Sequence, residues 1–208
     1  MLVNGWSAGV TRRRLAPLAA LVVVAVAGAG VAWAACGGVQ QVKPQKDANL
    51  GRAPIAIGDS PMLLALPNLA QIGYRANARG CRQWAEGLAL IRKLRRQDHL
   101  PKLVVVGLGS NGTVTKGDIR TALDLVGKKR TLGLITPRET GGVASHDADV
   151  VRSQARKHKN RTVLLDWVKF SAGHPAWFQA DGLHLTFDGA AAMARLLKRP
   201  LKHLPPPH

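Results

Sequence analysis

Short apolar runs alternate with helix-like segments from residue 53 to residue 198, and this alternation constrains the fold more than any other feature. The runs are rich in Ala, Val, Ile and Leu, which is typical of strands buried on both faces of a sheet. Ser60 and Ser145 stand where helix N-caps are expected. The pattern predicts an α/β fold with a parallel sheet covered by helices on both faces. The predicted strands are 53–58, 71–76, 102–108, 131–136 and 162–166, and the predicted helices are 61–69, 82–97, 116–126, 145–158 and 186–197.

An uncharged apolar run at residues 15–35 follows a cluster of arginines, Arg12 to Arg14. With small residues at Ala32 and Ala34, this arrangement is typical of a secretory signal peptide. The run is also long enough to serve as a single membrane anchor. The sequence therefore predicts that residues 1–35 direct the protein to a secreted or extracytoplasmic location, either as a cleaved signal or as a retained anchor.

The segment between the leader and the first predicted strand, residues 36–52, is polar and predicts a linker. The predicted domain covers residues 53–198, and residues 199–208 form a C-terminal tail. The chain has two cysteines, Cys36 and Cys81, which in an oxidising compartment form either a disulfide or two unpaired thiols. Two cysteines without suitably spaced histidines do not make a zinc site, so no metal and no other cofactor is expected.

The chain is strongly basic, with a formal net charge of +18 at pH 7. Such a surface attracts polyanions, although net charge alone specifies no partner and could serve solubility only. With one Tyr and three Phe there is little aromatic surface for base stacking, so no nucleic acid partner is expected. An anionic cell-envelope polymer is the alternative partner, and the protein itself is expected to be a monomer.

Polar residues follow the predicted strands at the points where the strands end. Because reactive groups gather at the carboxyl ends of parallel strands, we expect these residues to share one edge of the sheet. They are Asp59 and Ser60 after the first strand, Asn77, Arg79 and Gly80 after the second, Ser110 and Asn111 after the third, and Asp166, Asp181 and His184 after the fifth.

Three short motifs at this edge carry recognisable chemistry. Ser60, at a strand-to-helix turn, is a weak nucleophile until a base removes its proton, and its alternative role is an ordinary N-cap. Asp181 lies three residues before His184, a spacing that lets the carboxylate orient the imidazole as a general base; the alternative is a surface turn. His174 is a rival base, but it has no acidic residue nearby.

The third motif is the loop from Gly107 to Gly112, which contains Asn111. A side-chain amide there could stabilise a developing oxyanion, a contribution of about 3 kcal/mol from one donor. The loop lacks the Lys and Ser/Thr ending of a phosphate-binding loop, and the alternative is an Asn-Gly turn.

Taken in order, these motifs resemble those of the SGNH hydrolase family, also called GDSL-type esterases. The matching blocks are Gly58-Asp59-Ser60, Gly80, Gly109-Ser110-Asn111 and Asp181-Gly182-Leu183-His184. The resemblance implies a flavodoxin-like three-layer α/β/α domain with a five-stranded parallel sheet. It implies Ser60 as nucleophile, His184 and Asp181 as its catalytic partners, and an oxyanion hole made by Ser60, Gly80 and Asn111. The block around Gly80 matches loosely, and Pro61 departs from the family pattern because it removes a backbone N–H from the nucleophile turn.

A closer likeness is to SGNH domains that follow membrane acyltransferase-3 domains. It is carried by Gly58-Asp59-Ser60-Pro61-Met62, Gly109-Ser110-Asn111-Gly112, Asp166-Trp167, His174-Pro175-Ala176-Trp177-Phe178 and Asp181-Gly182-Leu183-His184-Leu185-Thr186. The resemblance implies an extracytoplasmic serine esterase that works through an acyl-enzyme on an acyl ester or acylated glycan. The alternatives are O-acyl transfer to, or deacetylation of, cell-envelope polysaccharide, and a non-catalytic envelope-binding module. One apolar segment cannot form an acyl transporter, so a transferase would need a separate membrane acyl-donor protein.

Overall fold

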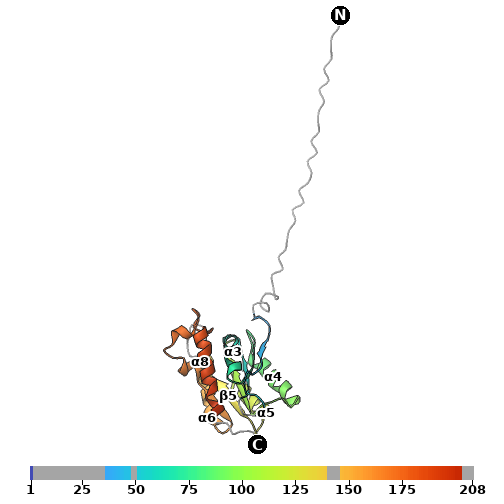
Figure 1. Cartoon of the computed structure of the whole chain (residues 1–208), viewed down its shortest axis with the longest axis vertical. Helices are drawn as coiled ribbons and strands as arrows, with labels where there is room; N and C mark the ends of the chain where they lie inside the picture. Colours follow the sequence, from blue (N-terminus) through green and yellow to red (C-terminus); the bar gives the residue numbers. More distant parts are fainter. Residues whose placement is uncertain (2–35, 48–50, 140–145, 203–208) are drawn as a thin grey trace.

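The computed structural model describes Met1 and residues 36–47, 51–139 and 146–202 (Figure 1). The rest of the predicted leader, the predicted N-cap Ser145 and the end of the predicted tail, 203–208, lie outside the described residues. Within the described ranges, no helix combines the length and apolar character that a membrane span requires.

A six-stranded sheet forms the centre of the domain, with the strand order β1-β3-β2-β4-β5-β6. The five strands from β2 to β6 are parallel, as predicted, and β1 pairs antiparallel with β3 at one edge. The strands are β1 (Gln40–Val42), β2 (Ile55–Gly58), β3 (Arg75–Ala78), β4 (Leu103–Gly107), β5 (Thr131–Ile135) and β6 (Thr162–Leu165).

The sixth strand corrects two sequence predictions, the five-strand count and the linker at 36–52. Gln40 to Val42 pair with Ala78 to Ala76 of β3, so part of the predicted linker belongs to the sheet. The strand is polar because it lies at the edge of the sheet, where Gln40 and Gln41 are exposed and Val42 alone packs on the core.

Helices cover both faces of the sheet and make the predicted three-layer α/β/α arrangement (Figure 1). One face carries α4 (Trp84–Arg96), α5 (Lys116–Val126) and α6 (His146–Lys157), and its core includes Ile57, Ile91 and Leu134. The other face carries α2 (Ser60–Leu63), α3 (Leu66–Gln71), α7 (Trp167–Phe170) and α8 (Phe187–Lys198), and its core includes Leu69 and Ala190. The short 3₁₀ helices η2 (Pro175–Trp177) and η3 (Pro200–Lys202) flank α8 in sequence.

The single helix predicted at 61–69 is in fact two short helices, α2 and α3. Pro67 lies in the first turn of α3, where its missing N–H is tolerated, whereas inside a continuous helix it would remove a hydrogen bond. Because α3 continues to Gln71, the second strand begins later than predicted, at Arg75 rather than residue 71.

A disulfide between Cys36 and Cys81 resolves the alternative that the sequence left open. Cys81 directly follows the turn at the carboxyl end of β3, so the bond holds the start of segment 36–47 at the edge where the predicted site lies. The contact is close, because a Cβ added to Gly80 would lie 2.4 Å from the carbonyl oxygen of Cys36. Position 80 therefore accepts only glycine without a backbone shift.

Candidate active site

Ser60 stands at the turn between β2 and α2, as the sequence predicts, but as the first helical residue rather than the N-cap. The N-cap is Asp59, whose side chain makes no capping hydrogen bond. Pro61 follows inside the first turn, and the backbone N–H of Met62 donates to the carbonyl oxygen of Asp59 at 3.1 Å. The hydroxyl of Ser60 is consequently free of any capping role and available to the residues opposite it.

His184 and Asp181 reach Ser60 from the loop that precedes α8. The Nε2 atom of His184 lies 3.0 Å from the Oγ atom of Ser60, and its Nδ1 atom lies 2.5 Å from the Oδ2 atom of Asp181. The other carboxylate oxygen accepts the backbone N–H groups of Leu183 at 2.9 Å and His184 at 3.0 Å. The structure therefore brings together the three residues predicted as nucleophile, base and orienting acid, which are far apart in the sequence.

The environment of Asp181 keeps its carboxylate ionised. The hydrogen bond from His184, followed by the backbone hydrogen bond from Leu183, lowers the pKa of Asp181 from 3.8 to about 2. A charged acceptor holds the proton of the imidazole on Nδ1 and leaves Nε2 as the acceptor that faces Ser60. Chemically, such an arrangement can take the proton of the serine hydroxyl as the oxygen attacks a carbonyl group.

Arg138, which the sequence motifs did not single out, supports the turn between Asp181 and His184. Its Nε atom donates to the carbonyl oxygen of Gly182 at 3.2 Å, and its Nη1 atom donates to the Oγ atom of Ser171 at 3.2 Å. Gly182 has a φ of 67°, in the left-handed region that favours glycine. Arg138 also lies 4.1 Å above the centre of the Phe178 ring, so the guanidinium connects the aromatic core to this turn.

The side-chain amide of Asn111 has a property expected of a hydrogen-bond donor to an oxyanion. Its Nδ2 atom is buried and has no hydrogen-bond partner within the described part of the chain. An unsatisfied buried donor costs about 1–3 kcal/mol, so such groups often have a functional explanation. Gly80, the other predicted donor, lies in a turn that is held to the nucleophile strand by a 3.3 Å hydrogen bond from the backbone N–H of Arg79 to the carbonyl oxygen of Gly58.

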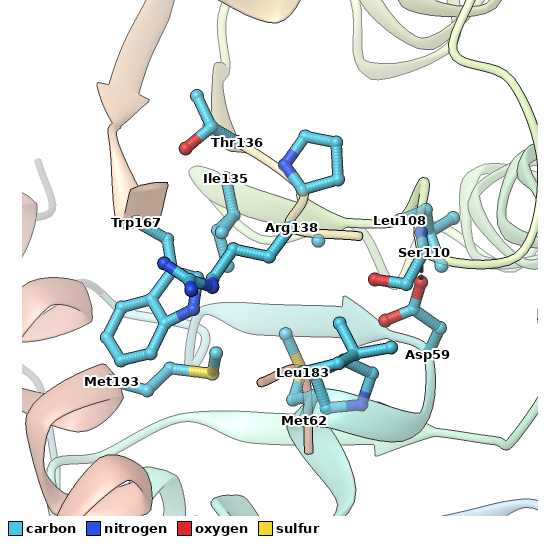
Figure 2. A pocket seen from close by; sticks show the side chains of 13 residues that line it. Asp59, Met62, Leu108, Ser110, Ile135, Thr136, Arg138, Trp167, Leu183 and Met193 are labelled. Carbon is cyan, nitrogen blue, oxygen red and sulfur yellow. Dashed lines mark hydrogen bonds between the residues drawn. The ribbon is translucent and has the colours of Figure 1, made fainter. Parts of the chain in front are cut away.

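Asp59 connects the nucleophile turn to the loop that carries Asn111, a role that sequence reasoning missed. Its carboxylate is 3 % exposed and accepts the backbone N–H of Ser110 at 3.1 Å (Figure 2). Figure 2 shows Asp59 facing Ser110 at one side of a largely apolar pocket, with Trp167 and Met193 at the other. Burial raises the pKa of Asp59 from 3.8 to about 6, against the opposing effect of the backbone hydrogen bonds.

The raised pKa of Asp59 predicts a pH dependence of stability. Between about pH 4 and pH 6 the folded protein binds the Asp59 proton more tightly than the unfolded chain, so the free energy of unfolding falls as the pH rises through this range. A shift of this size corresponds to about 3 kcal/mol. Asp59→Asn keeps an acceptor for Ser110 but cannot titrate. Urea unfolding at pH 4 and pH 7 should therefore show a smaller decrease in stability for the variant than for the wild type, whereas parallel pH profiles would contradict the assignment.

Arg82 is a second connection that the motifs did not reveal. Its buried guanidinium donates to the carbonyl oxygens of Gly58 at 3.1 Å and Asn77 at 2.7 Å, and to the Oδ1 atom of Asn77 at 2.6 Å. Asn77, one of the polar residues predicted at this edge, is therefore occupied in holding the ends of β2 and β3 together.

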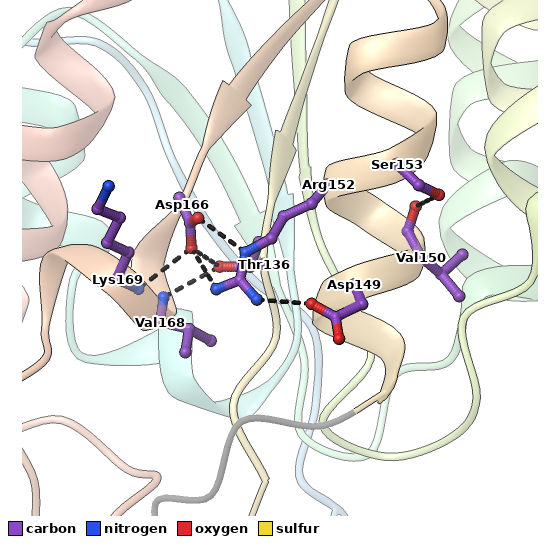
Figure 3. A network of polar contacts seen from close by, with 8 residues as sticks. All are labelled: Thr136, Asp149, Val150, Arg152, Ser153, Asp166, Val168 and Lys169. Atoms are coloured by element: carbon purple, nitrogen blue, oxygen red, sulfur yellow. Dashed lines mark hydrogen bonds and ion pairs between the residues drawn. The ribbon is translucent and has the colours of Figure 1, made fainter.

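Two other residues from the sequence prediction have structural partners. Asp166 accepts hydrogen bonds from Arg152 through both carboxylate oxygens, from Thr136 at 3.1 Å and from the backbone of Lys169 at 3.1 Å (Figure 3). The carboxylate thereby caps α7 and joins it to α6. The rival base His174 stacks on Trp177, with ring centres 3.9 Å apart, so its ring packs against an aromatic cluster.

Comparison with known proteins relates the chain to acetyl-transferring enzymes. The chain is 32% identical over 161 residues to the O-acetyltransferase OatA of Staphylococcus aureus, a match that covers 72% of this chain and 25% of that protein. It is 31% identical over 145 residues to the peptidoglycan O-acetyltransferase OatA of Listeria monocytogenes, covering 69% of this chain and 23% of that protein. The chain thus spans about a quarter of the length of these curated relatives. No family model matches the sequence.

Among solved structures, the C-terminal catalytic domain of the Streptococcus pneumoniae peptidoglycan O-acetyltransferase A has the same fold. The TM-score is 0.62 at 22% identity, and the match covers 73% of this chain and 93% of that domain. The fold and the homology agree with the resemblance that the motifs suggested.

Proposed function

Since the chain belongs to the SGNH hydrolases, a family of ester-acting enzymes, and is homologous to O-acetyltransferases, we propose that it transfers acetyl groups on cell-wall polysaccharide through an acetylated Ser60. The observation that carries this proposal is the hydrogen-bonded series from Ser60 through His184 to Asp181. When water replaces the sugar hydroxyl as acceptor, the same site acts as an esterase.

In the first half of the reaction, the Oγ atom of Ser60 attacks the acetyl carbonyl while His184 takes its proton. The oxyanion that forms accepts hydrogen bonds from the Nδ2 atom of Asn111 and from the backbone N–H groups of Ser60 and Gly80. The N–H of Met62 already donates to Asp59, so it does not contribute. His184 then protonates the departing oxygen, and the acetyl group remains on Ser60.

In the second half, a hydroxyl group attacks the acetylated serine. His184 removes the proton of this hydroxyl and returns it to the Oγ atom of Ser60 as the new ester leaves. Asp181 remains ionised and stabilises the imidazolium that forms in each half-reaction. Whether the acetyl group passes to a sugar or to water then depends on which hydroxyl lies within reach of His184.

The surroundings that this function requires are proposals as well. A disulfide between Cys36 and Cys81 suits an oxidising, extracytoplasmic compartment. The acetyl donor would come from a separate membrane acyl-donor protein, in keeping with the likeness of the motifs to SGNH domains that follow membrane acyltransferase-3 domains. The basic surface would favour an anionic envelope polymer as the substrate or its neighbour. No group of three His, Cys, Asp or Glu side chains within the described ranges could hold a metal ion, and the proposed chemistry uses none.

An acetyl-transfer assay tests the proposed function directly. The protein is incubated with p-nitrophenyl acetate as donor and a tetrasaccharide of N-acetylglucosamine and N-acetylmuramic acid as acceptor. We expect both nitrophenol release and an acetylated tetrasaccharide detected by mass spectrometry. Nitrophenol release without the acetylated sugar would show that the protein hydrolyses the ester but does not transfer the acetyl group. The absence of both products would favour a non-catalytic binding module.

A further inference from the structure

The groove that contains Ser60 and His184 has one wall outside the SGNH motifs. Its lining consists of the catalytic pair, two glutamines and three leucines, namely Gln40, Ser60, Leu63, Leu64, Gln179, His184 and Leu185. Gln40 belongs to β1, in the segment expected from the sequence to be a linker. A residue of the edge strand therefore lies beside the nucleophile and the general base.

The segment from Cys36 to Val42 is held in place at three points. The disulfide with Cys81 fixes one end, with the carbonyl group of Cys36 against Gly80. The pairing of β1 with β3 fixes the other end, where Val42 also packs on the core. This wall of the groove is thus part of the folded domain.

The two glutamines of β1 face opposite sides of the sheet because side chains alternate along a strand. Gln40 pairs with Ala78, whose side chain belongs to the core on the α3 and α8 face, and Gln40 lines the groove on this face. Gln41 pairs with Asn77, whose side chain contacts Arg82 on the other face. Gln40 and Gln41 are therefore adjacent glutamines of which the first lines the groove and the second faces the other side of the sheet.

The lining suits a sugar chain. Gln179 donates from Nε2 to the carbonyl oxygen of Leu185 at 3.1 Å, which fixes its amide and leaves Oε1 to accept a hydroxyl. Gln40 is exposed and offers both a donor and an acceptor. The leucines, among them the 36 % exposed Leu64, provide an apolar surface for the face of a sugar ring. The described lining contains no Asp, Glu, Lys or Arg side chain, so its hydrogen-bonding groups suit the hydroxyl and N-acetyl groups of sugar rings.

We propose that the segment Cys36–Val42 forms a sugar-binding wall of the groove, and that Gln40 is a specificity-determining residue that hydrogen-bonds the glycan beside Ser60. This inference rests on the proposed function for the choice of glycan. It assigns to the disulfide the role of holding the wall in register with the catalytic pair.

Binding measured without turnover tests this inference. In the Ser60→Ala protein, the tetrasaccharide described above is titrated by isothermal calorimetry. Adding Gln40→Ala should weaken the Kd about tenfold, because a well-placed hydrogen bond or two is removed. Adding Gln41→Ala should change the Kd by less than about twofold. Thermal melting verifies that each variant is folded. We expect folded variants because Gln40 and Gln41 are exposed positions on an edge strand.

A second variant tests the role of the disulfide. Cys36→Ser with Cys81→Ser should weaken tetrasaccharide binding at least as much as Gln40→Ala, and adding Gln40→Ala to it should then have little further effect. Equal binding by the Gln40→Ala protein and its parent, equal losses from Gln40→Ala and Gln41→Ala, or no tetrasaccharide binding by the Ser60→Ala parent would each overturn the inference. Failure of the proposed function gives a different result, namely no acetyl-group turnover by the wild type despite Gln40-dependent binding.

Discussion

Replacing Ser60 by alanine should lower kcat for p-nitrophenyl acetate by about 10⁴-fold or more, since loss of the nucleophile in a serine triad has effects of this order. The Oγ atom is the group that His184 contacts and the one that would carry the acetyl group. Its removal leaves the oxyanion donors in place, so some activity above the uncatalysed rate should remain. The fold should be intact, because the side chain makes neither a capping bond nor a core contact.

Ser153→Ala is the matched control for this prediction. Ser153 lies in α6, which packs on the face of the sheet opposite to the groove. Its hydroxyl donates to the carbonyl oxygen of Val150 at 3.0 Å (Figure 3). A fluorophosphonate probe followed by peptide mass spectrometry should locate the label on Ser60 in the wild type and in Ser153→Ala, and should find none in Ser60→Ala. Unchanged turnover by Ser60→Ala, or a label on another serine, would remove Ser60 from the mechanism.

The fold was predictable because buried parallel strands leave a strong and local signal. The strand predicted at 102–108 extends beyond β4 (Leu103–Gly107) by only one residue at each end. The helix predicted at 116–126 matches α5. The site residues were predictable in position for a related reason. Ser60 and Asn111 lie in the turns and loops that follow the carboxyl ends of β2 and β4, and a parallel sheet places these ends at one edge.

The parts that could not be predicted depend on contacts between distant segments. β1 is three residues long and polar, and its pairing with β3 follows from the disulfide and from Val42 packing on the core, neither of which has a local pattern. Likewise, Arg82 and Arg138 look like surface cations in the sequence. In the structure, Arg82 donates to the carbonyl oxygen of Gly58 and Arg138 donates to that of Gly182. Because every residue has a backbone carbonyl group, the sequence does not indicate which one an arginine will contact.

Asp181→Asn tests whether the acid orients the base or only shapes a turn. In the asparagine variant, the remaining carbonyl oxygen can still accept the backbone N–H groups of Leu183 and His184, so the turn should survive. The amide nitrogen would then face Nδ1 of His184, which must become an acceptor and place its proton on Nε2, toward Ser60. An imidazole in this tautomer cannot take the serine proton. We therefore expect kcat for p-nitrophenyl acetate to fall by about 10⁴-fold with KM little changed.

The control for Asp181 is Asp149→Asn, which alters a surface carboxylate that pairs with Arg152 at 2.9 Å, and it should leave kcat within about twofold. The pKa of about 2 for Asp181 adds a further expectation, because the carboxylate stays charged at any pH where the enzyme is assayed. Loss of wild-type activity on mild acidification must then come from a group other than Asp181. If Asp181→Asn instead retains activity within about tenfold of the wild type, the turn held by Arg138 is sufficient to orient His184, and the site works as a serine–histidine pair supported by backbone geometry.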